Sequence, residues 1–298
     1  MSYRSRAFGT AFALALLTGC GGSGALAPAD SIRQALGETR TGRPIIATTA
    51  VHGRPAPAKA RSGIYVAQFF SPYVYGYPLD NSKNGPPLCN VYNPYASVND
   101  IAVDGNGNLL IPLEIPNEVL IYKGTRMCGP WAATIADPYG QPTGAAANDA
   151  IHGTIAVANI FDLYGPGSIS LCTVSGGCTQ NLTNPNLYAV GGVAMDRQGN
   201  CWGSGFNSSY ASVLIYFAGC SGSGVAATGI ANTQGYGSID IDEHGNLVVV
   251  SIPTDLYVYH GCKPKCKKIG GPFSLEGDTI FGHLNKNSTA FAAGDSQY

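Results

Sequence analysis

The sequence repeats itself with a period of 46 residues. Gly107, Gly199 and Gly245 are each the fourth residue of an Asp-x-x-Gly-Asn turn. They are separated by 92 and 46 residues, so the period predicts a further glycine at 153. Gly153 is there, although Ala150 replaces the turn Asp in that copy. Four copies in one register indicate a repeat architecture. The three best-matched copies are residues 101–109, 193–201 and 239–247.

Each copy predicts a β-hairpin, because an apolar strand runs into the Asp-x-x-Gly turn and a second apolar strand follows it. The Asp side chain can accept backbone N–H groups of the turn, and the Gly can take a positive φ. A third strand follows at residues 119–122, 213–216 and 256–259, and a weaker fourth at 132–136 or 224–230.

Four antiparallel strands in 46 residues is the size of a propeller blade. A helical repeat would need apolar stripes at a 3.6-residue period, and the sequence has none. Its 40 Gly, 17 Tyr and three Met also favour short strands joined by tight turns. We therefore expect an all-β protein, a β-propeller of four-stranded blades over residues 63–298.

The two ends of this region decide the number of blades. Repeats begin near 99, 145, 191 and 237, and further strands are expected at 63–70, 73–77, 89–92, 279–283 and 290–293. These additional strands predict six blades, one of them incomplete. A five-bladed ring closed by the overlapping ends is the alternative.

The Asp-x-x-Gly-Asn hairpins and the later Val-Leu-Ile-Tyr strand resemble the NHL-type propellers and the wider gluconolactonase-like, senescence-marker-protein superfamily. In the gluconolactonase-like enzymes, Glu, Asn and Asp side chains from several blades hold a metal in the central channel. Here the corresponding loops carry Gly191, Gly192, Gly237 and Ser238 on two blades, although Asp240, Glu276 and Asp278 could contribute. We therefore expect no metal site and no cofactor, and we identify no catalytic residue.

The loops that enter the inner strands are expected to rim the channel. In the 46-residue register they carry four side chains that can bind a ligand or partner: Asn99, Asp100, Asn148 and Asp149.

The N-terminus predicts export. A basic start is followed by the apolar run 7–17, which is too short to span a membrane and is typical of a secretory signal. The ending Leu17-Thr18-Gly19-Cys20 resembles the bacterial lipoprotein signal, in which the Cys is acylated. We thus expect residues 1–20 to be a signal peptide with Cys20 as the lipid-attachment site, followed by a flexible tether over residues 21–62 that is rich in Ala, Pro, Gly and Thr.

The eight other cysteines are an even number in an exported chain, which predicts disulfides. Short spacings pair Cys172 with Cys178 and Cys262 with Cys266, and strand geometry can bring Cys201 to Cys220. The pairing of Cys89 and Cys128 stays open.

The function predicted from the sequence is binding. A net charge of −1 with 12% charged residues disfavours a nucleic-acid partner. No standard hydrolase or phosphate-loop motif is present. We expect a binding or scaffold module, attached to the cell envelope by its lipid and facing outside the cytoplasm, on the outer membrane or the cell surface. Its ligand would be an unidentified protein or carbohydrate. The alternative is a metal-dependent, lactonase-like hydrolase acting in the channel.

Overall fold

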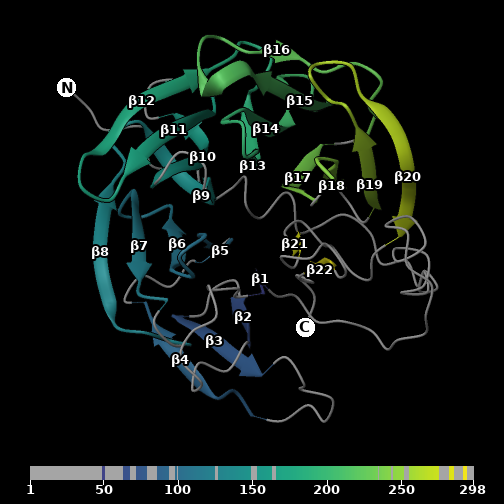
Figure 1. Ribbon diagram of the computed structural model, residues 1–298. Coiled ribbons are helices and arrows are strands. Elements are labelled where there is room, and N and C mark those ends of the chain that lie inside the picture. Colours follow the sequence, from purple (N-terminus) through teal and green to yellow (C-terminus); the bar gives the residue numbers. More distant parts are fainter. Residues whose placement is uncertain are drawn as a thin grey trace.

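The structure is a computed structural model that forms an all-β propeller of four-stranded antiparallel blades, as the repeat predicts (Figure 1). Five sheets of four strands and one sheet of two strands surround a common centre. The structure describes residues 49–50, 63–67, 72–78, 86–93, 98, 100–124, 127–148, 153–162, 166–233, 235–242, 244–251, 255–274, 282–284 and 291–293.

In all five four-stranded sheets the strands follow one another along the chain from the inner edge to the outer edge. Blade 1 contains β1 (Thr49–Ala50), β2 (Gly63–Ala67), β3 (Tyr73–Pro78) and β4 (Cys89–Tyr92). Blade 2 contains β5 (Ala102–Val103), β6 (Leu109–Leu113), β7 (Glu118–Tyr122) and β8 (Trp131–Ala136). Blade 3 contains β9 (Gly140–Asn148), β10 (Thr154–Asp162), β11 (Ser168–Thr173) and β12 (Gly177–Thr183).

Blade 4 contains β13 (Ala189–Met195), β14 (Cys201–Phe206), β15 (Ser212–Phe217), the 3-10 turn η2 (Ala218–Cys220) and β16 (Val225–Ala226). Blade 5 contains β17 (Tyr236–Ile241), β18 (Leu247–Ser251), β19 (Asp255–His260) and β20 (Lys267–Ser274). The two-stranded sheet pairs β21 (Gly282–Leu284) with β22 (Phe291–Ala293).

The inner strands make contact in ring order, from β1 through β5, β9, β13 and β17 to β21, which in turn contacts β1. Over the described residues the structure therefore has five four-stranded blades, the alternative count, and the two-stranded sheet lies between blade 5 and blade 1 in the ring. The first blade is complete because Thr49 and Ala50, which fall within the expected tether, form its inner strand. Cys20 and the rest of residues 1–62 lie outside the described residues.

The Asp-x-x-Gly-Asn turns have the predicted hydrogen bonds. Asp104 Oδ1 accepts the backbone N–H groups of Asn106 and Asn108 at 2.9 and 2.8 Å, and its Oδ2 accepts the Asn108 amide at 2.7 Å. Asp196 and Asp242 repeat the pattern in blades 4 and 5. The glycine of each turn has a positive φ, between 79° and 94° in all four copies, which a side chain would oppose. Three copies of the repeat thus share the same side-chain hydrogen bonds in the turn, and all four share the positive φ of its glycine.

The hydrophobic core consists of layers between neighbouring blades. The second strand of a blade is covered on both faces, so β6, β14 and β18 are buried along their whole length. Outer strands such as β8 and β20 are largely exposed. One layer joins blades 3 and 4 around Ile169, Leu187 and Phe217, and another joins blades 4 and 5 around Trp202, Tyr236 and Tyr259.

Four disulfides cross-link the propeller, three within single blades and one between two blades. The structure pairs Cys172 with Cys178, Cys201 with Cys220 and Cys262 with Cys266, which are the pairs expected from spacing and strand geometry. The open question is answered by a Cys89–Cys128 bond, which links the outer strand of blade 1 to the β7–β8 connection of blade 2. No helix within the described parts of the chain is long and apolar enough to cross a membrane.

Candidate functional site at the central channel

Three ionisable side chains from distant parts of the sequence meet on the inner side of the ring. Asp100 precedes β5 of blade 2, Asp240 lies on β17 of blade 5, and His283 lies on the closing strand β21. His283 Nε2 is 2.7 Å from Asp100 Oδ1, and its Nδ1 is 3.5 Å from Asp240 Oδ2. The imidazole therefore connects the two carboxylates across the channel side of the ring.

The two aspartates are themselves fixed by the backbone. Asp100 Oδ1 also accepts the N–H of Ile101 at 2.9 Å, and Asp240 Oδ1 accepts the N–H of Ile241 at 2.7 Å. The Asp100 side chain is 5% exposed and that of His283 is 12% exposed. Such burial makes an unpaired charge costly, so Asp100 and His283 depend on each other, whereas the Asp240 side chain is 29% exposed.

The charge state of His283 follows from this arrangement. Burial opposes the imidazolium, but the Asp100 carboxylate and its hydrogen bond, followed by Asp240, outweigh burial and raise the pKa of His283 from 6.5 to about 10. His283 is therefore a cation at neutral pH, with each ring nitrogen directed to a carboxylate. A general base needs an unprotonated nitrogen facing its substrate. His283 is arranged as an ionic cross-link instead.

The predicted rim residues are only partly brought together. Asp100 lies on the inner side of the ring, but its carboxylate is engaged by His283, and its role in ligand binding stays a prediction. Asn148 is the last residue of β9, where its backbone pairs with Thr154, and does not lie in a loop entering an inner strand. The rim position assigned to it is wrong because β9 already begins at Gly140. Asn99 and Asp149 lie outside the described residues.

Glycines of the expected rim serve close packing between blades 4 and 5. A Cβ on Gly192 would lie 2.6 Å from Ser238 Cα and 2.9 Å from Ile239 N, and one on Gly191 would meet the backbone of Tyr236 and Gly237. All of these residues lie within β13 or β17. The small side chains of these strands therefore let the two inner strands approach each other, and Ser238 is buried there.

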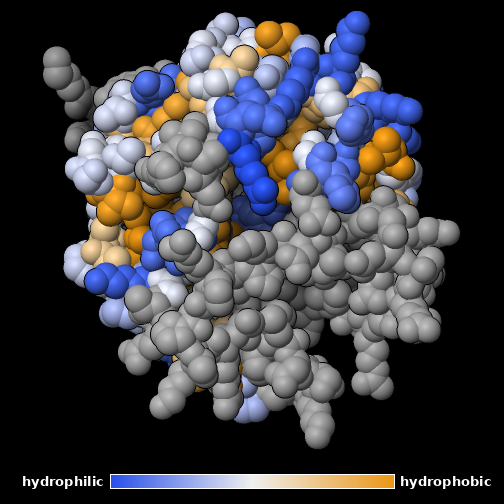
Figure 2. All heavy atoms as spheres, in the orientation of Figure 1, coloured by the Kyte–Doolittle hydropathy of each residue, from blue (hydrophilic) through white to orange (hydrophobic). Residues whose placement is uncertain are grey.

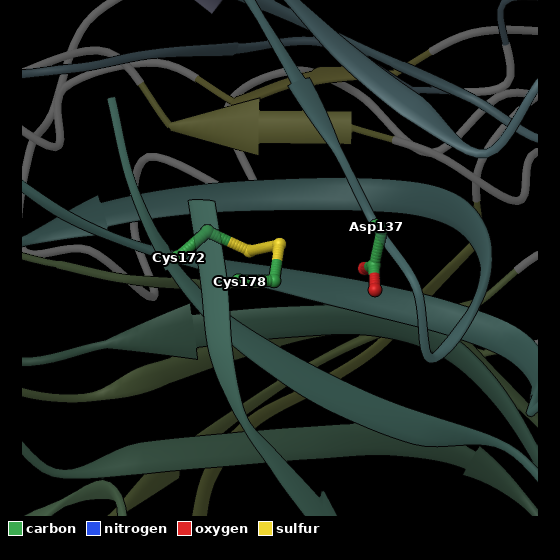
Figure 3. A group of neighbouring side chains, drawn as sticks. All are labelled: Asp137, Cys172 and Cys178. Carbon is green, nitrogen blue, oxygen red and sulfur yellow. A yellow bond between two sulfur atoms is a disulfide. The ribbon is translucent and has the colours of Figure 1, made fainter. Parts of the chain in front are cut away.

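One further cluster has the composition of a metal site. Asp137, Cys172 and Cys178 bring their ligand atoms within 4.8 Å of one another (Figure 3). The two sulfurs are bonded to each other, whereas a metal needs thiolates. Asp137 Oδ1 accepts hydrogen bonds from Ser170 Oγ and Tyr139 N, both at 2.9 Å. These residues fit a buried, hydrogen-bonded carboxylate beside a disulfide and do not fit a metal centre.

Comparison with known proteins supports the fold alone. No protein-family model matches the chain, and no curated protein sequence matches it. Among solved structures, it is similar to the one titled "Crystal structure of WD40 beta propeller domain of Doa1", with a TM-score of 0.59 and 11% identity over 86% of this chain and 77% of that chain. The structural similarity supports the β-propeller fold, and at 11% identity it shows nothing about function.

Sequence reasoning missed the role of His283. Asp100 and Asp240 had been considered for the channel, but His283 is separated from Asp100 by 183 positions. Its position at the end of an expected C-terminal strand was the one available signal, since that strand has to close the ring.

Proposed function

We propose that this protein is a binding or scaffold module rather than an enzyme. The observation that carries the proposal is the His283 cross-link. Among the described residues on the inner side of the ring, His283 is the imidazole that lies among carboxylates, and its two nitrogens are directed to Asp100 and Asp240. The eight cysteines beyond Cys20 are all in disulfides. These thiols and this imidazole are thus engaged in structural bonds, within single blades or between parts of the ring.

The lactonase-like alternative receives less support. A channel metal would need the carboxylates of Asp100 and Asp240, and the same imidazolium already pairs with both of them. The kinship with NHL-type and gluconolactonase-like propellers remains part of the proposal, supported by the Asp-capped hairpins.

Hydrolysis of simple lactones by the purified full-length chain tests the choice between the two functions. We expect no turnover above the uncatalysed rate, with or without added Ca²⁺. An activity that chelation removes, Ca²⁺ restores and Asp240→Asn abolishes would establish the enzyme in place of the binding module.

We further propose that the module is attached to the outside of the cell envelope through a lipid on Cys20. The Leu17-Thr18-Gly19-Cys20 sequence and the four disulfides, which form in oxidising compartments, support this placement. Cys20→Ala should release the protein from sedimented membranes or leave its leader uncleaved. Normal cleavage together with unchanged membrane retention of C20A would refute the anchor.

A further inference from the structure

Blade 4 presents three aromatic rings at one end. Tyr188 precedes β13, Phe206 ends β14, and Tyr210 lies in the turn between β14 and β15. The ring centroids of Phe206 and Tyr210 are 5.5 Å apart with an interplanar angle of 24°, and those of Tyr188 and Phe206 are 6.5 Å apart. Phe206 is buried, while Tyr188 and Tyr210 are 38% and 52% exposed. A buried ring therefore supports two exposed ones.

All three residues lie at the same end of the blade. In an antiparallel blade, the turn from the second to the third strand and the segment that leads into the first strand emerge on one face. The N–H of Tyr188 donates to the carbonyl of Phe206 at 2.9 Å, which fixes the segment to the strand end. The segment leading into blade 5 adjoins them, because Ser212 N donates to the Thr233 carbonyl at 3.2 Å. The surface thus continues from blade 4 to blade 5.

Tyr210 is held in an unfavourable backbone conformation. Its φ of +60° lies in the left-handed region, which costs a residue with a Cβ about 1 to 2 kcal/mol and which Gly or Asn usually occupies. Asn207 fixes the turn by accepting the N–H groups of Ser209 and Ala211 at 2.9 and 3.0 Å. A glycine at 210 would suit this turn better, so folding alone does not explain a half-exposed tyrosine there. Strain of this kind is found at functional sites.

The segments of blades 4 and 5 that adjoin the rings carry no charged side chain. Segments 184–192, 206–212 and 227–233 contain no Asp, Glu, Lys, Arg or His. Ser208, Ser209 and Asn232 are exposed, and Asn207 is half-buried. Figure 2 shows that apolar areas on the face it displays are separate from one another and interrupted by hydrophilic residues. A nucleic acid or an anionic headgroup would need cationic side chains, which these segments lack.

We propose that Tyr188, Phe206 and Tyr210 form a platform that binds a neutral carbohydrate, with pyranose rings lying on the exposed tyrosines. The C–H face of a sugar packs on an aromatic ring, and its hydroxyls need neutral donors and acceptors such as the Asn207 amide and the neighbouring serine hydroxyls. This inference rests on the proposed binding function and specifies its ligand class.

Affinity electrophoresis tests the platform. The full-length protein is run in native gels containing glycogen, dextran, galactomannan or hydroxyethylcellulose. We expect retardation by at least one of these polymers, insensitive to added salt because no charge is involved. Tyr210→Gly and Tyr188→Ala should each weaken binding about tenfold, which corresponds to about 1.4 kcal/mol. Glycine suits the φ at position 210, so Y210G should keep the unfolding midpoint of the parent protein.

Tyr92→Ala is the matched control, because Tyr92 is 57% exposed on the outer strand of blade 1. It should bind like the parent protein. Retardation by none of the four polymers overturns the inference, and so does equal loss of binding in Y92A. If Y188A and Y210G bind a polymer normally, the platform is refuted while the binding module stands. A proline-rich peptide bound by the parent protein and lost in both variants would replace the carbohydrate with a peptide ligand.

Discussion

Replacing His283 with glutamine removes the cation that joins Asp100 to Asp240. The Asp100 carboxylate then stays buried, at 5% exposure, without its charged partner. Breaking a buried ion pair from one side costs about 3 to 5 kcal/mol. The rise in the His283 pKa from 6.5 to about 10 gives a similar figure of about 5 kcal/mol, at 1.36 kcal/mol per pKa unit. Since whole domains have about 5 to 15 kcal/mol of stability, H283Q should be strongly destabilised.

The effect has a defined pH dependence. A folded-state pKa above the unfolded value means that the folded protein binds the proton more tightly, so the stabilisation is complete below pH 6.5 and is lost as the pH rises towards 10. Across that window the free energy of unfolding of the parent protein should fall by about 1.4 kcal/mol per pH unit relative to H283Q. Burial also raises the pKa of Tyr236 and Tyr65 above 10. Ionisation of these two tyrosines therefore does not affect the free energy of unfolding within this pH window.

Urea unfolding followed by tryptophan fluorescence measures this difference at pH 6, 7, 8 and 9. His260→Gln is the control, because His260 is exposed and its Nδ1 contacts the neutral Asn246 amide at 2.7 Å. H260Q should follow the pH profile of the parent protein. The double variant H283Q/D100N, which removes the orphaned charge, should recover part of the loss. Parallel pH profiles for the parent protein and H283Q would refute the cross-link.

Three other substitutions test the fold. Asp242→Ala removes the acceptor of three turn hydrogen bonds and should cost about 2 kcal/mol in urea unfolding; an unchanged midpoint would contradict its capping role. Gly192→Ala places a Cβ 2.6 Å from Ser238 Cα and should cost about 2 to 3 kcal/mol, whereas a neutral result would mean that β13 and β17 can separate freely. The double variant C201S/C220S opens a cross-link between residues 19 apart, and its free energy of unfolding should fall by about 3 kcal/mol. Equal stability of the reduced and oxidised parent protein would contradict this expectation.

The features that the sequence predicted well are local. The Asp104 turn depends on residues within four positions of the aspartate, and the Cys172–Cys178 bond depends on one hairpin, so both can be recognised from spacing. The His283 cluster depends on ring closure, which brings together residues 183 positions apart. No periodicity encodes that contact.

The errors also have physical causes. Asn148 was misplaced because β9 begins early and runs through the position where a loop was expected. Tyr210 escaped notice because its positive φ arises from the turn that Asn207 caps, in a sequence without glycine at that position. Strain of this sort is visible only in the backbone.

The disulfides also bear on how such a chain matures. Each bond joins a cysteine to the next one along the sequence, and the separations of 39, 6, 19 and 4 residues are all shorter than one repeat. With Cys20 acylated, as proposed above, each of the other cysteines in a chain oxidised while it emerges from a translocation pore would meet its correct partner first. Oxidation in the order of the chain would then produce the native pairing, one bond after another, without an isomerase.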